Sequence, residues 1–153
     1  MKLTSSVFEE GNVIPSLYTC EGKNINPPLE ITEIPNETKS LVLIMDDPDV
    51  PKNLRLSGMY DHWIVFNIPP STSKIEENTP PPGVQGRNTG GRNEYIGPCP
   101  PDAQHRYFFK LYALNTLLDL KEGVTKEEVE KAMEGHIIDQ CQLMAIYEKG
   151  KGY

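Results

Sequence analysis

The chain has 153 residues, a net charge of −7 at pH 7 and a sequence pI near 5.0. This length suits one domain with its own hydrophobic core, so we expect residues 1–153 to form a single domain. The acidic balance argues against nonspecific binding to nucleic acid or to an anionic membrane, and no apolar stretch approaches the ~20 residues that a membrane-spanning helix needs.

Three apolar runs predict the main strands. The run at 41–45 is short, continuous and soon followed by Pro48, which favours a buried strand over a helix. The run at 63–68 repeats this pattern and stops at Pro69. Residues 106–114 alternate between two faces, as the side chains of a strand do. Further strands are expected at 143–147 and, more weakly, near 3–8 and 29–31.

One helix is predicted near the C-terminal end of the chain. Thr125 and Glu128 have the spacing of a capping box, an apolar stripe follows them, and Gly135 marks the expected end. Loops dominate between about residues 71 and 99, a stretch long enough to contain a short strand or a functional loop. Together these patterns predict a mainly β protein, an antiparallel two-sheet β-sandwich with one or two peripheral helices.

Two short segments combine titratable side chains with turns that proline stiffens. One is DPDVP at 47–51, followed by His62 at the start of a predicted strand. The other is GPCPP at 97–101, followed by His105 and Tyr107 at the start of the next strong strand. Proline lowers the entropy lost when a loop is ordered, so such loops can hold side chains in one geometry. If these strands are neighbours, the polar side chains converge at one end of a sheet.

Such a set would form an anion site by a division of labour. The imidazoles of His62 and His105 can each present an N–H to a ligand, and Tyr107 adds a hydroxyl donor. The Asp47 carboxylate would accept from the other nitrogen of a histidine, and the Cys99 N–H could complete the cradle. A phosphate or carboxylate group fits these donors. A plainer interpretation stays open, in which Asp47 caps a turn and each histidine is packed in the core.

The cysteines and the N-terminus bear on the cellular compartment. Cys20, Cys99 and Cys141 are odd in number and lack CxxC spacing, which argues against a disulfide framework and against a zinc site. Residues 1–6 lack the apolar core of a signal peptide. We therefore expect a cytoplasmic protein.

The two motifs together resemble the phosphatidylethanolamine-binding protein family, and in particular its compact bacterial and archaeal branch, also called Raf kinase inhibitor-like proteins. The resemblance covers nearly the whole chain, including the helix that begins near Thr125. It implies a two-sheet β-sandwich with a small anion pocket, and a binding or regulatory protein that is not an enzyme and has no cofactor. Carried over by motif, the ligand-binding residues are Asp47, Pro51, His62, Cys99, Pro100, Pro101, His105 and Tyr107.

The resemblance also implies partners. The family binds phosphate-bearing head groups, and its members inhibit kinases or serine proteases. Cys99 stands where eukaryotic members often have glycine, and Tyr60 and Asp61 precede His62 where many have an aromatic residue or a second histidine. The chain also lacks the long terminal helix of the eukaryotic branch, so a serine protease inhibitor is the more concrete activity implied. Either a monomer or a homodimer is compatible with the sequence.

Two enzymatic alternatives remain. Cys99 and His105 could form a nucleophile and its base. A position at a helix N-terminus would lower the pKa of the Cys99 thiol, but Cys99 lies between prolines instead. Alternatively, His62, His105 and Asp47 could bind a metal ion as two histidines and a carboxylate in a small hydrolase. The spacing includes no tight HxH or HxxxH arrangement, which argues against the metal site.

Overall fold

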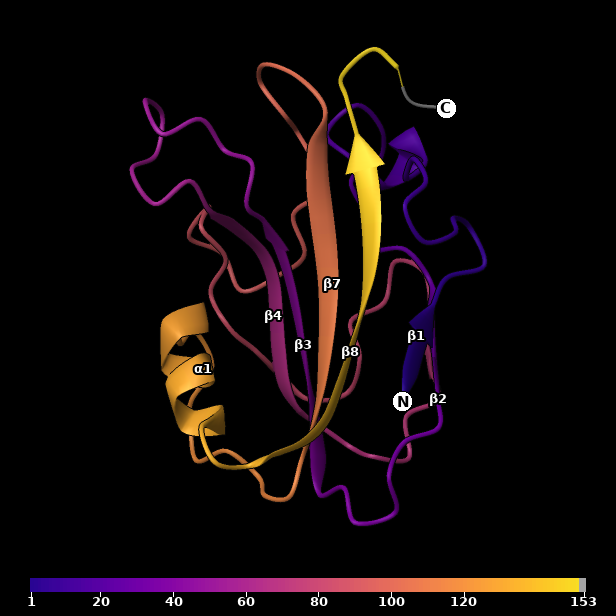
Figure 1. The fold of residues 1–153 in the computed structure, drawn as a ribbon, viewed down its shortest axis with the longest axis vertical. Coiled ribbons are helices and arrows are strands. Elements are labelled where there is room, and N and C mark those ends of the chain that lie inside the picture. The colour runs from indigo at the N-terminus through magenta and orange to yellow at the C-terminus, as the bar shows by residue number, and fades with distance from the viewer. Residues whose placement is uncertain (152–153) are drawn as a thin grey trace.

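The computed structural model describes residues 1–151, and two antiparallel sheets dominate it (Figure 1). The larger sheet has the order β6-β4-β3-β7-β8, with β3 at its centre. The smaller sheet has the order β1-β2-β5. The strands of the larger sheet are β3 (Ser40–Asp47), β4 (Tyr60–Ile68), β6 (Val84–Gln85), β7 (His105–Leu114) and β8 (Ile137–Tyr147). Those of the smaller sheet are β1 (Lys2–Thr4), β2 (Leu29–Thr32) and β5 (Lys74–Ile75).

The predicted mainly β sandwich is confirmed, with differences in the extent of its elements. The three strong apolar runs form β3, β4 and β7, and the fourth predicted strand is longer than expected, because β8 begins at Ile137. The loop-rich stretch between residues 71 and 99 contains the two short strands β5 and β6. A short 3-10 helix, η1 (Ser16–Tyr18), was not predicted, because three residues are too few to show a periodic pattern.

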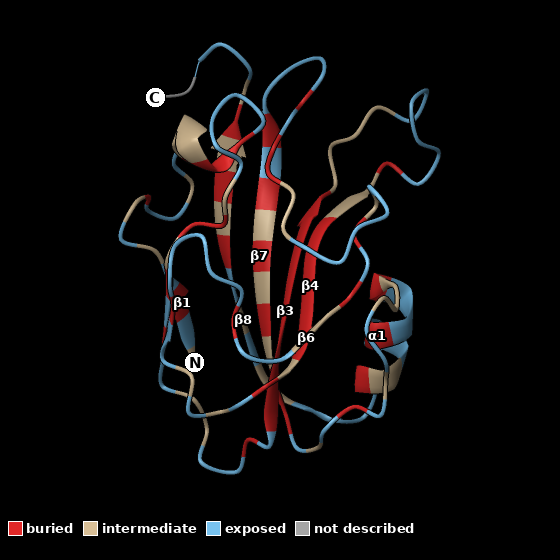
Figure 2. Ribbon diagram, turned by 180° about the vertical axis from the view of Figure 1, so that it is seen from behind, coloured by how far each residue is buried: buried red, intermediate tan, exposed pale blue. Residues whose placement is uncertain are grey.

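The sheet order explains why β3 reads as a continuous apolar run. Every residue of β3 is buried, as the unbroken red colour of that strand in Figure 2 shows. Leu43 and Met45 pack into the core that lies between the two sheets. Ile44 faces the opposite way, into a second core beneath the helix α1 (Lys126–Met133). The central strand is therefore covered on both faces, by a sheet on one side and by a helix on the other.

The helix α1 begins and packs as its sequence predicts. The Thr125 side chain accepts a hydrogen bond from the Glu128 N–H at 3.3 Å, so the predicted N-cap is confirmed. The first residue, Lys126, is buried, and its Nζ pairs with carboxylates of Asp46 at 3.3 Å and Asp61 at 2.8 Å. A buried charge requires such partners, so these pairs fix the helix start against the sheet. No helix in the described residues is long and apolar enough to cross a membrane.

Candidate functional site

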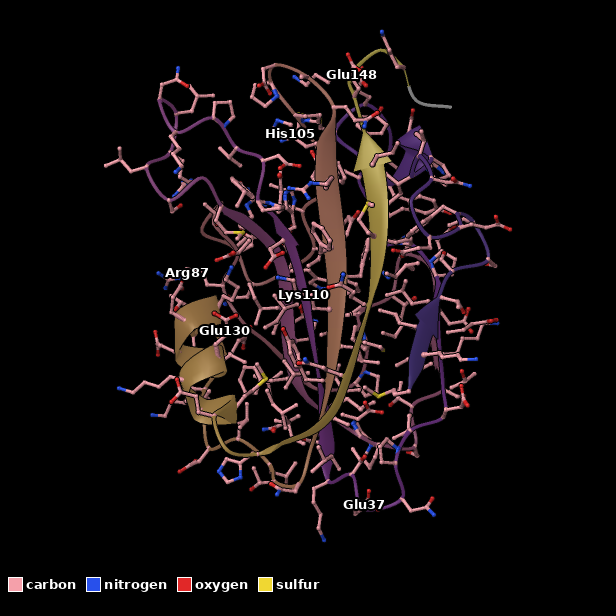
Figure 3. All side chains as sticks on the ribbon, in the orientation of Figure 1. Glu37, Arg87, His105, Lys110, Glu130 and Glu148 are labelled. Carbon is pink, nitrogen blue, oxygen red and sulfur yellow. A yellow bond between two sulfur atoms is a disulfide. The ribbon has the colours of Figure 1, made fainter. Side chains whose placement is uncertain are left out.

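The predicted polar residues meet at one end of the larger sheet, where β3 ends and β4 and β7 begin. Figure 3 shows His105 at that end of β7 beside the surrounding loops, whereas Lys110 lies midway along the same strand. A cavity of about 370 Å³ lies there. Its lining includes Asp47, Val50, Leu54, Arg55, Tyr60, His62, Ile96, Gly97, Cys99, Pro100, Pro101, His105 and Tyr107.

A β-bulge in β4 brings His62 to the cavity. The register passes from Met45 opposite Trp63 to Asp46 opposite Asp61, so His62 is an extra residue without a partner on β3. Regular alternation would place His62 on the helix-covered face and Asp61 on the cavity face. The bulge reverses them: His62 lines the cavity, and Asp61 pairs with the buried lysine of α1.

His105 lies between two carboxylates. Its Nδ1 is 2.7 Å from Oδ2 of Asp47, and its Nε2 is 2.7 Å from Oδ1 of Asp102. Burial lowers the pKa of His105, but the hydrogen bonds and charges of Asp47 and Asp102 raise it above its usual value overall. The ring is therefore held as imidazolium, with both N–H groups already bonded. Asp102 was missed by sequence reasoning, although its place three residues before His105 was a usable signal.

The carboxylate of Asp47 has a second task. Burial raises the pKa of Asp47, and the hydrogen bond from His105 opposes that rise. Its Oδ1 accepts from the N–H of Asp49 at 2.7 Å, so the turn-capping interpretation also holds. Asp49 in turn accepts from Nε and Nη2 of Arg106 at 2.9 and 2.8 Å. This bidentate pair fastens the loop after β3 to the start of β7.

The His62 ring is held differently from that of His105. Its Nδ1 lies 2.7 Å from the carbonyl oxygen of Ile96. A carbonyl can only accept, so Nδ1 carries the hydrogen. Burial lowers the pKa of His62 to about 4, against smaller opposing effects of that hydrogen bond and the charge of Asp46. The expectation that both imidazoles present an N–H to a ligand is therefore wrong for His62, whose remaining nitrogen Nε2 is an acceptor at neutral pH.

Tyr107 supplies a donor without a protein partner. The residue is buried, and its hydroxyl makes no hydrogen bond to any described residue. Burial, followed by the charge of the nearby Asp47 carboxylate and its hydrogen-bonding influence, raises the pKa of Tyr107 far above its usual value. The hydroxyl therefore keeps its proton, although no hydrogen bond of normal geometry joins it to Asp47. An unpartnered buried hydroxyl is unfavourable unless something else accepts from it. Tyr107 also stands edge-on to the His62 ring, with the two centroids 5.3 Å apart.

One side of the cavity is formed by residues 96–101, which we call the tied rim. A disulfide joins Cys99 to Cys20, with 5.4 Å between their Cα atoms. The N–H of Gly97 donates to Oδ1 of Asn24 at 2.7 Å, and the N–H of Cys20 donates to the carbonyl oxygen of Pro98 at 3.1 Å. The expectation of no disulfide is therefore wrong. The two cysteines are 79 residues apart, and only the folded chain brings them together.

The disulfide also affects two other expectations. In this state Cys99 has no free thiol, so the proposed Cys99–His105 nucleophile is not formed. Disulfides persist mainly in oxidising compartments, so the cysteines no longer support a reducing environment. The cytoplasmic location stays a prediction. Among residues 1–151, no group of three His, Cys, Asp or Glu side chains is placed to hold a metal ion, which also removes the ligand set of the metal-dependent alternative.

Another part of the cavity wall comes from residues 51–58, which we call the open rim. Pro51 does not line the cavity, unlike the other seven residues implied by the resemblance. Its carbonyl oxygen instead accepts from the N–H groups of Leu54 and Arg55 at 2.9 and 3.1 Å. Leu54 and Arg55 do line the cavity, as does Tyr60, and sequence reasoning missed all three as site residues. Loop side chains of this kind carry no periodic signal.

The arginines outside the two motifs differ in their distance from the cavity. Figure 3 shows Arg87 beside α1, well away from His105. Arg55 is the arginine of the cavity lining, and its guanidinium lies 5.8 Å from the ring centroid of Tyr60. The cavity lining therefore includes one exposed arginine in addition to the imidazolium of His105.

Known proteins share this architecture over nearly the whole chain. A family model described as phosphatidylethanolamine-binding protein matches residues 4–148. A protein of Chlamydia trachomatis serovar D named "UPF0098 protein" is 51% identical over 149 residues, which are 97% of this chain and 99% of the relative. A crystal structure of a phosphatidylethanolamine-binding protein homologue from Chlamydia trachomatis has a TM-score of 0.94 at 51% identity and covers 96% of each chain. The Escherichia coli protein YbcL, described as a member of the mammalian family, has a TM-score of 0.86 at 29% identity and covers 96% of this chain and 97% of its own.

Proposed function

We propose that this chain, which belongs to the phosphatidylethanolamine-binding protein family, uses its cavity to bind a small oxyanion, with a phosphoryl group as the leading case. The cavity of about 370 Å³ has room for a small polar ligand and only a few polar side chains to orient it. His105, Tyr107 and Arg55 are the groups that favour an anion there.

The unpartnered hydroxyl of Tyr107 carries the proposal. It is the buried donor of the cavity that no described residue satisfies, and a phosphoryl oxygen is a strong acceptor. The imidazolium of His105 adds positive charge next to it, with the two ring centroids 6.4 Å apart. Both residues line the cavity, so one oxyanion can accept from the Tyr107 hydroxyl and approach the charged ring of His105.

Asp102 must move for the ligand to reach His105. Its carboxylate occupies Nε2 of His105, the nitrogen that Asp47 does not use. The Asp102 side chain is half exposed, so it can turn into solvent without disturbing the core. A phosphoryl group would then take over the same hydrogen bond. Asp102 therefore acts as an internal competitor in the free protein.

Isothermal titration with inorganic phosphate tests the proposal. Tyr107→Phe should raise the Kd for phosphate at least about tenfold, because a hydrogen bond to a charged group contributes roughly 1.5–3 kcal/mol. The same variant should unfold at an unchanged or higher denaturant concentration, since it removes an unpartnered buried group. Asp102→Ala should bind phosphate severalfold more tightly.

A matched tyrosine controls for loss of packing. The hydroxyl of Tyr95 donates to the carbonyl oxygen of Tyr18 at 2.7 Å, and Tyr95 does not line the cavity. Tyr95→Phe should therefore lower the free energy of unfolding by about 1 kcal/mol and leave phosphate affinity unchanged. No heat of binding from the wild type, or equal phosphate affinity in the wild type and Tyr107→Phe, would overturn the proposal.

We also propose the regulatory role that the resemblance implies, inhibition of a serine protease or a kinase. A cavity that binds an oxyanion can inhibit a serine protease or a kinase by binding a carboxylate or phosphoryl group on the surface of that enzyme. Inhibition assays with purified proteases of different specificity test this role, and Tyr107→Phe shows whether the cavity takes part. Catalysis by the cavity would be revealed by turnover of phosphate esters, which a binding protein does not produce.

A further inference from the structure

The protonation of His62 limits which oxyanions the cavity can accept. Nδ1 donates to the Ile96 carbonyl oxygen at 2.7 Å, which leaves Nε2 with a lone pair. No hydrogen bond joins Nε2 to any described residue, and His62 is part of the cavity lining. The cavity therefore presents an acceptor as well as the Tyr107 donor.

The surroundings of His62 keep the ring neutral. Its side chain is 4% exposed, and the rings packed against it are those of Tyr60 and Tyr107, with centroids at 4.8 and 5.3 Å. The charged groups near it act in opposite directions, since Asp46 raises its pKa and His105 lowers it. No carboxylate is bonded to the ring, because Asp47 is bonded to His105 instead. A neutral ring can accept one hydrogen bond at Nε2 and donate none there.

We infer that the cavity selects oxyanions that carry a proton, and so prefers a phosphate monoester to a phosphate diester or a sulfate ester. This inference rests on the proposed function. A monoester monoanion has a P–O–H group that can donate to Nε2 of His62, while a second oxygen accepts from Tyr107. The second ionisation of a monoester lies near pH 6, so this form is abundant in mildly acidic solution. Diesters and sulfate esters carry no such hydrogen.

An anion without a proton would interact unfavourably with Nε2 of His62. One of its oxygens would place a lone pair against that of Nε2, or the buried ring would have to take up a proton against its low pKa. Either route weakens binding relative to the monoester. The loss of one charge-assisted hydrogen bond corresponds to at least about a tenfold difference in Kd.

Three ligands of similar size test the selection; at pH 6.0 dimethyl phosphate and methyl sulfate are monoanions, and about half of the methyl phosphate still carries its P–O–H group. Isothermal titration at pH 6.0 compares methyl phosphate with dimethyl phosphate and methyl sulfate. Methyl phosphate should bind at least about tenfold more tightly than either of the others. At pH 8 its advantage should largely disappear, because the P–O–H group is lost. Changes in the charge of His105, Asp47 and Asp102 affect all three ligands, so the ratio of affinities reports on the ligand proton.

The variant His62→Phe supplies the matched control. It keeps an aromatic ring against Tyr107 and removes the acceptor, so the three ligands should bind it with similar affinities at pH 6.0. Thermal unfolding shows whether His62→Phe is folded. If it is unfolded, the comparison of wild-type affinities at pH 6.0 and pH 8 tests the inference instead. Binding of all three ligands by the wild type with equal affinity would overturn this inference and leave the proposed function standing. Binding of none of them would overturn both.

Discussion

The two rims of the cavity are built in opposite ways. The tied rim is joined to the rest of the molecule by the Cys20–Cys99 disulfide and by backbone hydrogen bonds to Asn24 and His62. The hydrogen bonds recorded for residues 52–58 of the open rim all stay between residues 51 and 59. Leu56, at the end of that loop, is 91% exposed.

This difference assigns a role to each rim. Residues with few buried contacts and only local hydrogen bonds open at low free energy, whereas a cross-linked segment does not. The tied rim therefore holds its cavity-lining groups in place, including the carbonyl oxygen of Ile96 that orients His62. Under the proposed function, the open rim is the side that opens most readily to a ligand.

Removing the disulfide that anchors the tied rim should lower the free energy of unfolding more than any other change considered below. Loss of a cross-link between residues 79 apart lowers the free energy of unfolding by about 4 kcal/mol in the chain-entropy account. We expect this loss in Cys20→Ser/Cys99→Ser, measured by urea unfolding under oxidising conditions. Cys141→Ser, which removes the free cysteine, is the control and should change stability by less than about 1 kcal/mol. Equal stability of the double variant and the wild type would mean that the tied rim does not depend on its cross-link.

Acid should lower the free energy of unfolding through His62, whose ring is bonded to the tied rim. The pKa of this ring is about 4 in the folded protein, against an ordinary 6.5. Below pH 6.5 the unfolded chain therefore binds a proton that the folded chain refuses, and stability falls as the pH drops towards 4. The shift corresponds to about 3 kcal/mol over that window.

Unfolding measured as a function of pH also separates the contribution of His62 to stability from that of His105. The pKa of His105 is raised, so its contribution is complete below pH 6.5 and is lost as the pH rises through its folded value. Unfolding measured between pH 4 and 6.5 should show a shallower slope in His62→Phe than in the wild type. An identical slope would show that the carboxylates of the protein, and not His62, govern its acid sensitivity.

Replacing a glycine by alanine in each rim should cause stability losses of intermediate size. A Cβ added at Gly97 would meet the carbonyl oxygen of Tyr18 and lie 2.5 Å from Oδ1 of Asn24, so Gly97→Ala should destabilise by about 2 kcal/mol. At Gly58 the nearest atoms are 3.6 Å away, and only the positive φ of +68° resists alanine, which should cost about 1 kcal/mol. Urea unfolding of both variants measures the difference. A larger loss at Gly58 would reverse the assignment of the rims.

The smallest effect is expected at the tip of the open rim. Leu56→Ser changes a side chain that is almost fully exposed, so the free energy of unfolding should change by less than about 0.5 kcal/mol. Thermal unfolding checks this value. A loss of more than about 1 kcal/mol would mean that Leu56 is covered in solution, for example by a second copy of the chain.

The sequence predicted the parts of the molecule that depend on local pattern. The apolar runs of β3, β4 and β7 and the cap at Thr125 are written in consecutive residues, and their pairing brought Asp47 next to His105 as expected. Contacts between distant loops carried no such signal, which is why the Cys20–Cys99 bond was missed. The state of His62 depends on burial and on a main-chain carbonyl, neither of which a residue type encodes.

The extra residue in β4 limits how the chain can change in length. If β4 lost its bulge and paired with regular alternation, Asp61 and His62 would exchange directions. The carboxylate that anchors the helix would then enter the cavity, and an imidazole would face the ammonium of Lys126. Evolutionary insertions and deletions, and engineered ones, should therefore be tolerated in the loop before β4 and rejected inside it.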